Sequence, residues 1–217
     1  MNSIVCIPLT ASSEQHARLL ALQAAFAQVC NAMSSVVQQT RCWNRVALHH
    51  MVYKSLRTQF PAIGSQMVCN AIYSVSRTSR LVFQHPGSPF NIAKLGAKQL
   101  PLLRFDSNCP VYFDRHTLSV KAGQLSMYTL DGRLRFNLAL SPANEVMFHD
   151  LKLQEVVLAR TKDGPFSLTF SFVDAGADTS KDAPPLVSEL DVDLVSPMPA
   201  MGTEIEIPEY VVVEEAI

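Results

Sequence analysis

Arginine and lysine side chains give the clearest chemical signal in this chain, because their number and placement suit the binding of phosphate groups. Residues 1–162 contain 17 Lys and Arg against 7 Asp and Glu, a formal charge of +10. Residues 163–217 contain one Lys and 12 Asp and Glu, a formal charge of −11. Such segregation predicts a nucleic-acid partner for the basic body and a separate role for the acidic end. The alternative is a basic helical face that binds nothing.

Ten basic residues are the candidate nucleic-acid contacts. They are Arg41, Arg45, Lys54, Arg57, Arg77, Arg80, Arg104, Lys121, Arg133 and Arg135. Arg133 and Arg135 lie two apart in a predicted strand, so they should project from one face of it. Trp43, close to two of these arginines, is either a platform for an unpaired base or an interhelical core residue.

The residue patterns of common catalytic and metal sites do not occur in the sequence. The six histidines lack H-E-x-x-H and any Cys/His ligand spacing, and no phosphate-binding glycine loop or G-x-S-x-G is found. The five cysteines are scattered and never spaced C-x-x-C, as expected for reduced thiols in the cytoplasm. We therefore expect a protein that is not an enzyme and that needs no metal or cofactor.

Two segments have the alternating pattern of β-hairpins. Residues 124–140 place an apolar side chain at every second position around Asp131-Gly132, a dipeptide typical of a type I′ turn. Residues 152–173 repeat the pattern around Asp163-Gly164. Together with a short strand at 116–121, the hairpins predict a sheet that curls into a small antiparallel barrel.

Three helices are predicted before these strands. Ser12 and Gln15 have the spacing of a capping box, and an apolar stripe with helical period follows to about residue 39. Asn44 can cap a second helix to about residue 58, and Gly64-Ser65 opens a third. A further short helical turn is expected at 144–149.

The predicted fold class is α+β: a small curled antiparallel barrel with a three-helix insertion and an acidic C-terminal tail. The predicted parts are residues 1–10, the first barrel strand; 11–84, the inserted helical bundle; 85–101, a linker; 102–173, the barrel; and 174–217, an extended or disordered tail containing prolines. The sequence has no apolar run of 18 residues and no basic leader. We therefore expect a cytoplasmic protein without a membrane partner.

The order and spacing of these segments carry a family resemblance. In residues 104–136, Asp114 and the strand Leu118-Ser119-Val120-Lys121 precede Leu130-Asp131-Gly132-Arg133. This arrangement resembles the wedge-domain segment of TnpB-type transposon-encoded RNA-guided nucleases and their compact Cas12 relatives. Residues 44–80 are similar to the recognition-lobe helices of the same family. The resemblance covers roughly residues 1–173, the N-terminal half of such a nuclease.

The nuclease half of that family has no counterpart here. A RuvC-type domain would open with a G-(V/I)-D-x-G strand, and Asp193 stands where its catalytic aspartate would fall. Both flanking glycines are absent, and Pro197 and Pro199 soon interrupt the segment. A two-metal cleavage site needs several carboxylates. We therefore interpret Asp193 as an ordinary acid of the tail.

The resemblance implies recognition of nucleic-acid backbones. The implied partners are a structured guide-type RNA, a target DNA duplex and, in one arrangement, separately encoded effector subunits. The implied function is that of a nuclease-less guide-RNA-binding subunit or a repressor that acts by occupancy. Two alternatives stay open: an inhibitor whose acidic tail mimics nucleic acid, and a decayed transposon fragment.

Overall fold

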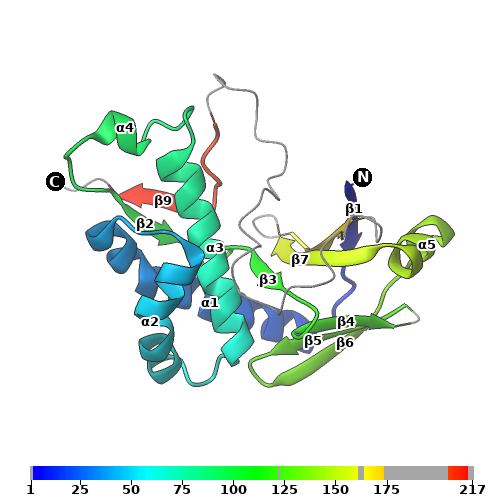
Figure 1. Ribbon diagram of the computed structural model, residues 1–217. Helices are drawn as coiled ribbons and strands as arrows, with labels where there is room; N and C mark the ends of the chain where they lie inside the picture. The colour runs from blue at the N-terminus through cyan, green and yellow to red at the C-terminus, as the bar shows by residue number, and fades with distance from the viewer. Residues whose placement is uncertain (1, 122, 161–163, 174–204, 215–217) are drawn as a thin grey trace, which may run out of the picture.

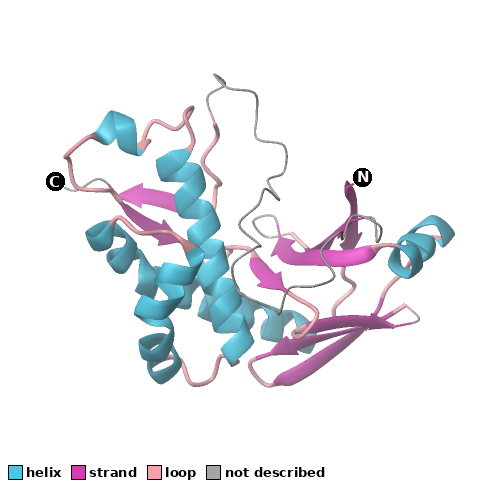
Figure 2. Cartoon of the chain, in the orientation of Figure 1, coloured by secondary structure: helices cyan, strands magenta, loops and turns pink. Residues whose placement is uncertain are grey.

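The structure is a computed structural model, and it describes residues 2–121, 123–160, 164–173 and 205–214. They form an α+β fold in which most of the helical residues gather on one side and most of the strands on the other (Figures 1 and 2). The described strands form three sheets of four, three and two strands, and their pairings are antiparallel. The α+β class is confirmed. No sheet of the described strands closes into a barrel.

The N-terminal strand belongs to the four-stranded sheet. Its order is β1 (Asn2–Pro8), β8 (Phe166–Val173), β7 (Lys152–Arg160) and β3 (Val111–Phe113). β1 pairs with β8 along its whole length, from Asn2 with Val173 to Pro8 with Ser167. The predicted pairing of the first strand with the late strands is therefore confirmed, as is the β7–β8 hairpin. Asp163 of its turn lies outside the described residues.

The three-stranded sheet consists of β4 (Leu118–Lys121), β5 (Gln124–Thr129) and β6 (Gly132–Asn137). The predicted hairpin is confirmed, but its predicted type I′ turn is wrong. Thr129 pairs with Gly132, and of these turn residues only Gly132 has a positive φ, of 89°. A type I′ turn centred on Asp131-Gly132 would need positive φ at both residues. The observed register instead makes Leu130 and Asp131 the two loop residues, and the pairing continues from Gly132 onward without a bulge.

Three long helices follow β1, as predicted. They are α1 (Ser13–Thr40), α2 (Arg45–Gln59) and α3 (Ser65–Gln84). The capping box is present, with Gln15 N–H donating to Ser12 Oγ and Ser12 N–H donating to Gln15 Oε1. Asn44 accepts two N–H bonds at the start of α2. Local sequence thus determines where these two helices begin.

Two shorter helices interrupt the connections. α4 (Ile92–Leu95) lies in the predicted linker, and α5 (Pro142–Asp150) covers the expected helical turn. The linker is tied to the body, because buried Asn91 donates to the carbonyls of Gln84 and His85. Residues 85–101 therefore form an anchored segment of the helical side.

One apolar core runs through both sides of the molecule. Phe26 of α1 is fully buried, and so are Phe170 and Phe172 of β8. Phe148 of α5 packs edge-on against both of these β8 rings. α1 is long and apolar enough to cross a membrane, but in this fold its stripe is buried, with α3 and β2 as its main neighbours.

Residues 205–214 are the described part of the predicted C-terminal tail, and they include a paired strand that the prediction of a mostly extended or disordered segment did not foresee. β9 (Val211–Glu214) pairs with β2 (Leu102–Phe105) and forms the two-stranded sheet. The β-branched run Val211-Val212-Val213 favours a strand, and Val211 is buried. The acidic composition of the surrounding segment concealed this short apolar run.

The other edge of β2 is held by a side chain. Asn31 of α1 donates from Nδ2 to the Phe105 carbonyl at 2.9 Å and accepts from Phe105 N–H at 2.7 Å. The side-chain amide thus pairs with the backbone N–H and C=O of Phe105, as the backbone of a neighbouring strand would. It joins the longest helix to the sheet that holds the C-terminal strand.

Asn31→Ala should destabilise the fold by about 1–3 kcal/mol, because it leaves both partly buried peptide groups of Phe105 without partners. The measurement is the free energy of unfolding in urea. Ser35→Ala, on an exposed position one turn later in α1, is the control and should change it little. Equal stabilities of the two variants would contradict this role of Asn31.

Candidate nucleic-acid interface

The outer surface of sheet β4–β5–β6 gathers three of the candidate residues. Strand alternation buries Leu118, Leu125, Met127, Leu134 and Phe136 on the inner surface. The cross-strand register places the other set together on the outer surface. This set, which we name the basic sheet face, is Ser119, Lys121, Gln124, Ser126, Tyr128, Arg133, Arg135 and Asn137. It contains three basic side chains, no acidic one and an exposed aromatic ring.

Tyr128 and Arg133 form a stacked pair at the hairpin end of this face. They are cross-strand partners, and the guanidinium carbon lies 4.2 Å from the ring centroid. Arg133 also donates from Nε to Ser126 Oγ at 2.8 Å and from Nη2 to the Ser126 carbonyl at 3.1 Å. Tyr128 is 43% exposed. A fixed guanidinium on an exposed ring is a surface on which a base can stack.

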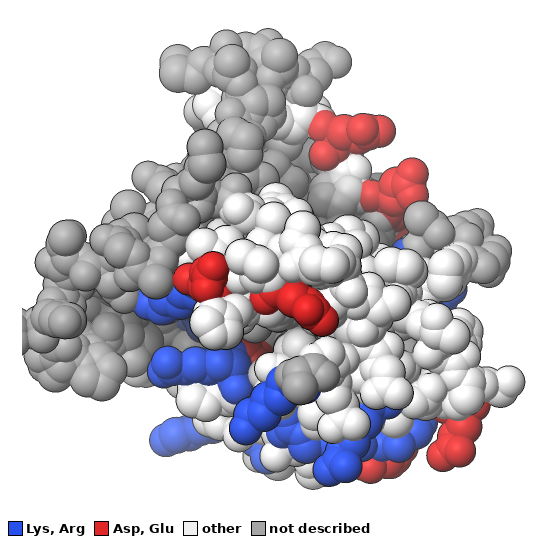
Figure 3. Space-filling model, turned by 90° about the vertical axis from the view of Figure 1, so that its right-hand side faces the viewer, with Lys and Arg blue, Asp and Glu red and all other residues white. Residues whose placement is uncertain are grey.

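Basic side chains gather on this side of the molecule. Figure 3 views the side that carries β1, α5 and the three-stranded sheet, and Lys and Arg lie mainly along its lower part. Lys121, Arg133 and Arg135 are all exposed. The sequence-based expectation that Arg133 and Arg135 share one face is confirmed by the register.

The N-terminal turns of α1 hold the β5–β6 hairpin in place. Arg18 donates from Nη2 to Thr129 Oγ1 at 2.9 Å and to the Asp131 carbonyl at 2.8 Å. Gln15 donates to the Arg135 carbonyl at 3.0 Å. Arg18 is not among the ten residues predicted from the sequence. Its spacing of four residues from buried Leu22 is a signal that it lies along the buried face of α1.

Three of the ten candidates make contacts that hold separate segments of the fold together. Arg41 donates to the carbonyls of Gly96 and Lys98, and Arg57 donates to the Ile63 carbonyl. These contacts anchor a loop and the end of a helix. Sequence spacing could not reveal them, because the accepting carbonyls belong to irregular backbone.

Arg77 is the third of these residues. It forms an ion pair with Glu155 of β7 at 3.1 Å and lies over the Tyr112 ring. Burial would lower the pKa of the guanidinium, but Tyr112, Glu155 and Tyr73 together raise that pKa above its usual value. Arg77 thus stays charged and links α3 to the four-stranded sheet.

A second basic surface follows α2. Arg45 lies 5.2 Å from the centroid of the Tyr73 ring, and Lys54 is exposed. His49 stacks on Tyr53 with centroids 4.6 Å apart. Burial, then the neighbouring His50 and Arg45, lower the pKa of His49 below 6.5. His49 therefore adds charge to this surface only when the pH falls below that value.

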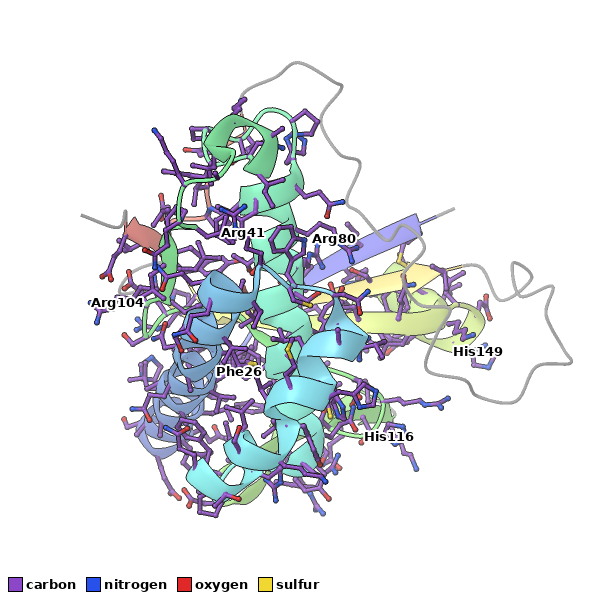
Figure 4. All side chains as sticks on the ribbon, turned by 60° about the vertical axis from the view of Figure 1, so that its left-hand side comes forward. Phe26, Arg41, Arg80, Arg104, His116 and His149 are labelled. Carbon is purple, nitrogen blue, oxygen red and sulfur yellow. The ribbon has the colours of Figure 1, made fainter. Side chains whose placement is uncertain are left out.

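The remaining candidates are spread over other parts of the surface. Arg104 pairs with Glu214 of β9 at 3.0 Å, and Arg80 is exposed on α3. Figure 4 shows Arg104 apart from Arg41 and Arg80. The ten candidates thus do not form one continuous surface.

Trp43 occupies an interhelical position. Its ring lies 5.6 Å from that of Phe83, and its Nε1 donates to Gln84 Oε1 at 3.3 Å. Its backbone carbonyl accepts from Ser76 Oγ. The structure therefore favours the interpretation of Trp43 as an interhelical core residue. The exposed ring that suits base stacking is that of Tyr128, which the sequence analysis did not identify.

The described part of the chain shows no metal-binding constellation. No group of three or more His, Cys, Asp or Glu side chains in it could hold an ion. Asp193 lies outside the described residues.

No protein-family model matches the chain, and no curated protein matches it. The assignment of the site therefore depends on its own geometry.

His49 should titrate with a pKa below 6.5, and His50→Ala should raise that pKa by removing a neighbouring positive charge. The folded state then binds fewer protons at His49 than the unfolded state does, so this residue lowers stability as the pH falls below 6.5. NMR titration of the imidazole resonances measures the pKa. An unchanged His49 midpoint in the variant would contradict the coupling.

Proposed function

We propose that this chain is a nuclease-less RNA-binding protein that holds nucleic acid on the basic sheet face. One observation carries the proposal: Lys121, Arg133, Arg135 and exposed Tyr128 share one surface of the three-stranded sheet, and that surface contains no acidic side chain. Basic groups interleaved with an exposed ring suit a phosphate backbone and its unpaired bases.

Each side chain of the face has a distinct chemical role in this proposal. Lys121 and Arg135 neutralise phosphates, since neither has an acidic neighbour on the face. The Tyr128–Arg133 pair receives a base. Gln124 and Asn137, which are cross-strand partners, offer amide groups to phosphate or base edges. In this arrangement contacts to the RNA backbone supply most of the affinity. The RNA sequence is then recognised by base pairing with another nucleic acid and not by this face.

The resemblance to TnpB-type and compact Cas12 nucleases extends the proposal. It suggests a structured guide RNA and a target DNA duplex as ligands, with separately encoded subunits supplying any cleavage. The single apolar core beneath the four- and three-stranded sheets is compatible with a curled wedge-like β-domain. In this proposal the chain acts as a guide-RNA-binding subunit or as a repressor by occupancy.

A second candidate function has one observation in its favour. The acidic C-terminal segment docks on the body through β9, where Glu214 pairs with Arg104. An acidic segment that covers a basic surface can compete with nucleic acid, as in a mimic or inhibitor of a related effector. This pair is exposed and therefore weak, so we place this candidate second.

Removing the two arginines of the basic sheet face should weaken RNA binding through the loss of phosphate contacts. Arg133→Ala with Arg135→Ala should flatten the slope of log affinity against log salt by about one to two units, at roughly 0.7–0.9 per contact. Fluorescence anisotropy with a structured RNA over a salt series measures the slope. The control, Lys94→Ala with Lys98→Ala, removes the same charge from the α4 region and should leave the slope unchanged. Equal effects of both pairs would contradict a localised site.

Tyr128 should contribute by stacking and not through its hydroxyl. Tyr128→Ala should weaken binding of single-stranded RNA by about 1–3 kcal/mol, whereas Tyr128→Phe should retain it. Titration of each variant with the same labelled oligonucleotide makes the comparison. A loss in both variants would assign the effect to the hydroxyl and exclude the stacking role.

The isolated protein should cleave neither RNA nor DNA with Mg²⁺ or Mn²⁺. A two-metal site needs clustered carboxylates, and Asp193 lacks the sequence context of one. Gel analysis of labelled substrates tests this expectation. Metal-dependent cleavage that survives Asp193→Ala would reveal another catalytic site, and cleavage lost in that variant would make Asp193 catalytic.

A further inference from the structure

β1 has one hydrogen-bonding edge without a strand partner among the described residues. It stands at the end of the four-stranded sheet, where β8 is its neighbour. Among the described elements, β8 is also the one with which β1 makes extensive contact. An edge strand presents a row of peptide N–H and C=O groups on which a further strand can pair.

One hydrogen bond determines which peptide groups of β1 face outward. Leu9 N–H donates to the Phe166 carbonyl at 2.8 Å, and these residues continue the β1–β8 register. In an antiparallel pair, residues bonded to the neighbour alternate with residues whose groups point away from it. The outward-facing residues of β1 are therefore Asn2, Ile4, Cys6 and Pro8. The missing N–H of Pro8 thus costs no bond to β8.

The side chains of β1 leave this edge open to pairing. The strand contains no charged residue, whereas edges that natural proteins protect commonly carry lysine, an inward-pointing charge or proline. Its one proline, Pro8, stands at the last position of the strand and removes the outward N–H there only. Ile4 is 67% exposed, and Cys6 is exposed beside it. Val5 and Ile7 are buried in the core, so they fix the position of the strand.

We propose that β1 is a dimerisation strand that pairs with β1 of a second copy of this chain. An antiparallel pair with its two-fold axis at Val5 aligns the whole strand with itself. Ile4 then faces Cys6 of the second copy, and Asn2 faces Pro8. The two four-stranded sheets join into one continuous sheet.

A second copy fits this edge better than a charged peptide does. The pairing is isologous, so every contact occurs twice, and an uncharged strand brings no like charges together at the axis. It also covers Ile4, the most exposed of the large apolar side chains described. A single pair of strands buries less than the roughly 1,200 Å² of stable interfaces, so the dimer should be concentration-dependent.

The dimer does not depend on nucleic-acid binding, because the basic sheet face belongs to a different sheet. If the chain both dimerises and binds nucleic acid as proposed, each dimer carries two basic sheet faces. The oligomeric state can therefore be tested with the full chain in the absence of any nucleic acid.

Sedimentation equilibrium over a concentration series, with reductant present, tests the proposal. Wild type should pass from the chain mass of 23.9 kDa toward twice that mass. Cys6→Pro removes an outward N–H without touching a bond to β8, so it should remain monomeric at every concentration. The matched control Cys6→Ala retains that N–H and should dimerise as wild type does.

A second variant guards against a folding defect in the proline variant. Ile4→Lys places a charge on an exposed position of the edge and should also shift the protein to monomer, with an unchanged thermal unfolding temperature. A wild-type chain that stays monomeric throughout would overturn the proposal. So would a dimer that persists in both Cys6→Pro and Ile4→Lys, because it would use another surface.

Discussion

The pairing of β1 with β8 brings the two ends of the chain body together and constrains nearly everything between them. Because Asn2 pairs with Val173, the three long helices must leave the sheet and return to it within one closed loop of chain. α1 begins five residues after β1 ends. Its first turns, with Gln15 and Arg18, therefore lie where they can hold the β5–β6 hairpin. The basic sheet face takes its position from this pairing.

Polar contacts then fix the helices against the strands. Asn31 of α1 bonds both peptide groups of Phe105 in β2, and Arg77 of α3 pairs with Glu155 of β7. Both contacts are partly buried, so the loss of one partner leaves the other unsatisfied. Several basic residues thus serve the fold, whereas Lys121, Arg133 and Arg135 stay exposed on the strands of the basic sheet face.

Sequence patterns predicted the elements whose signals are local. Caps at Ser12 and Asn44, helical stripes and alternating strands all correspond to observed elements. Two features that depend on non-local contacts were not predicted. One is β9, whose partner strand lies over a hundred positions earlier. The other is the set of hydrogen bonds of Arg41, whose acceptors are loop carbonyls. The stacking of Tyr128 was not predicted either, because a tyrosine at an alternating position does not reveal that it stacks with the arginine opposite. The observed β9 also means that removing the acidic end would cut into the fold.

Photocrosslinking of 4-thiouridine-containing RNA, followed by mass spectrometry of the adducts, tests the central claim most directly. If the basic sheet face binds RNA, adducts should concentrate in the peptides that span residues 118–137, with Tyr128 the foremost site. Adducts confined to α2, or to β2 and β9, with none on the three-stranded sheet would contradict the claim, because the ligand would then lie on a surface that the sheet does not form.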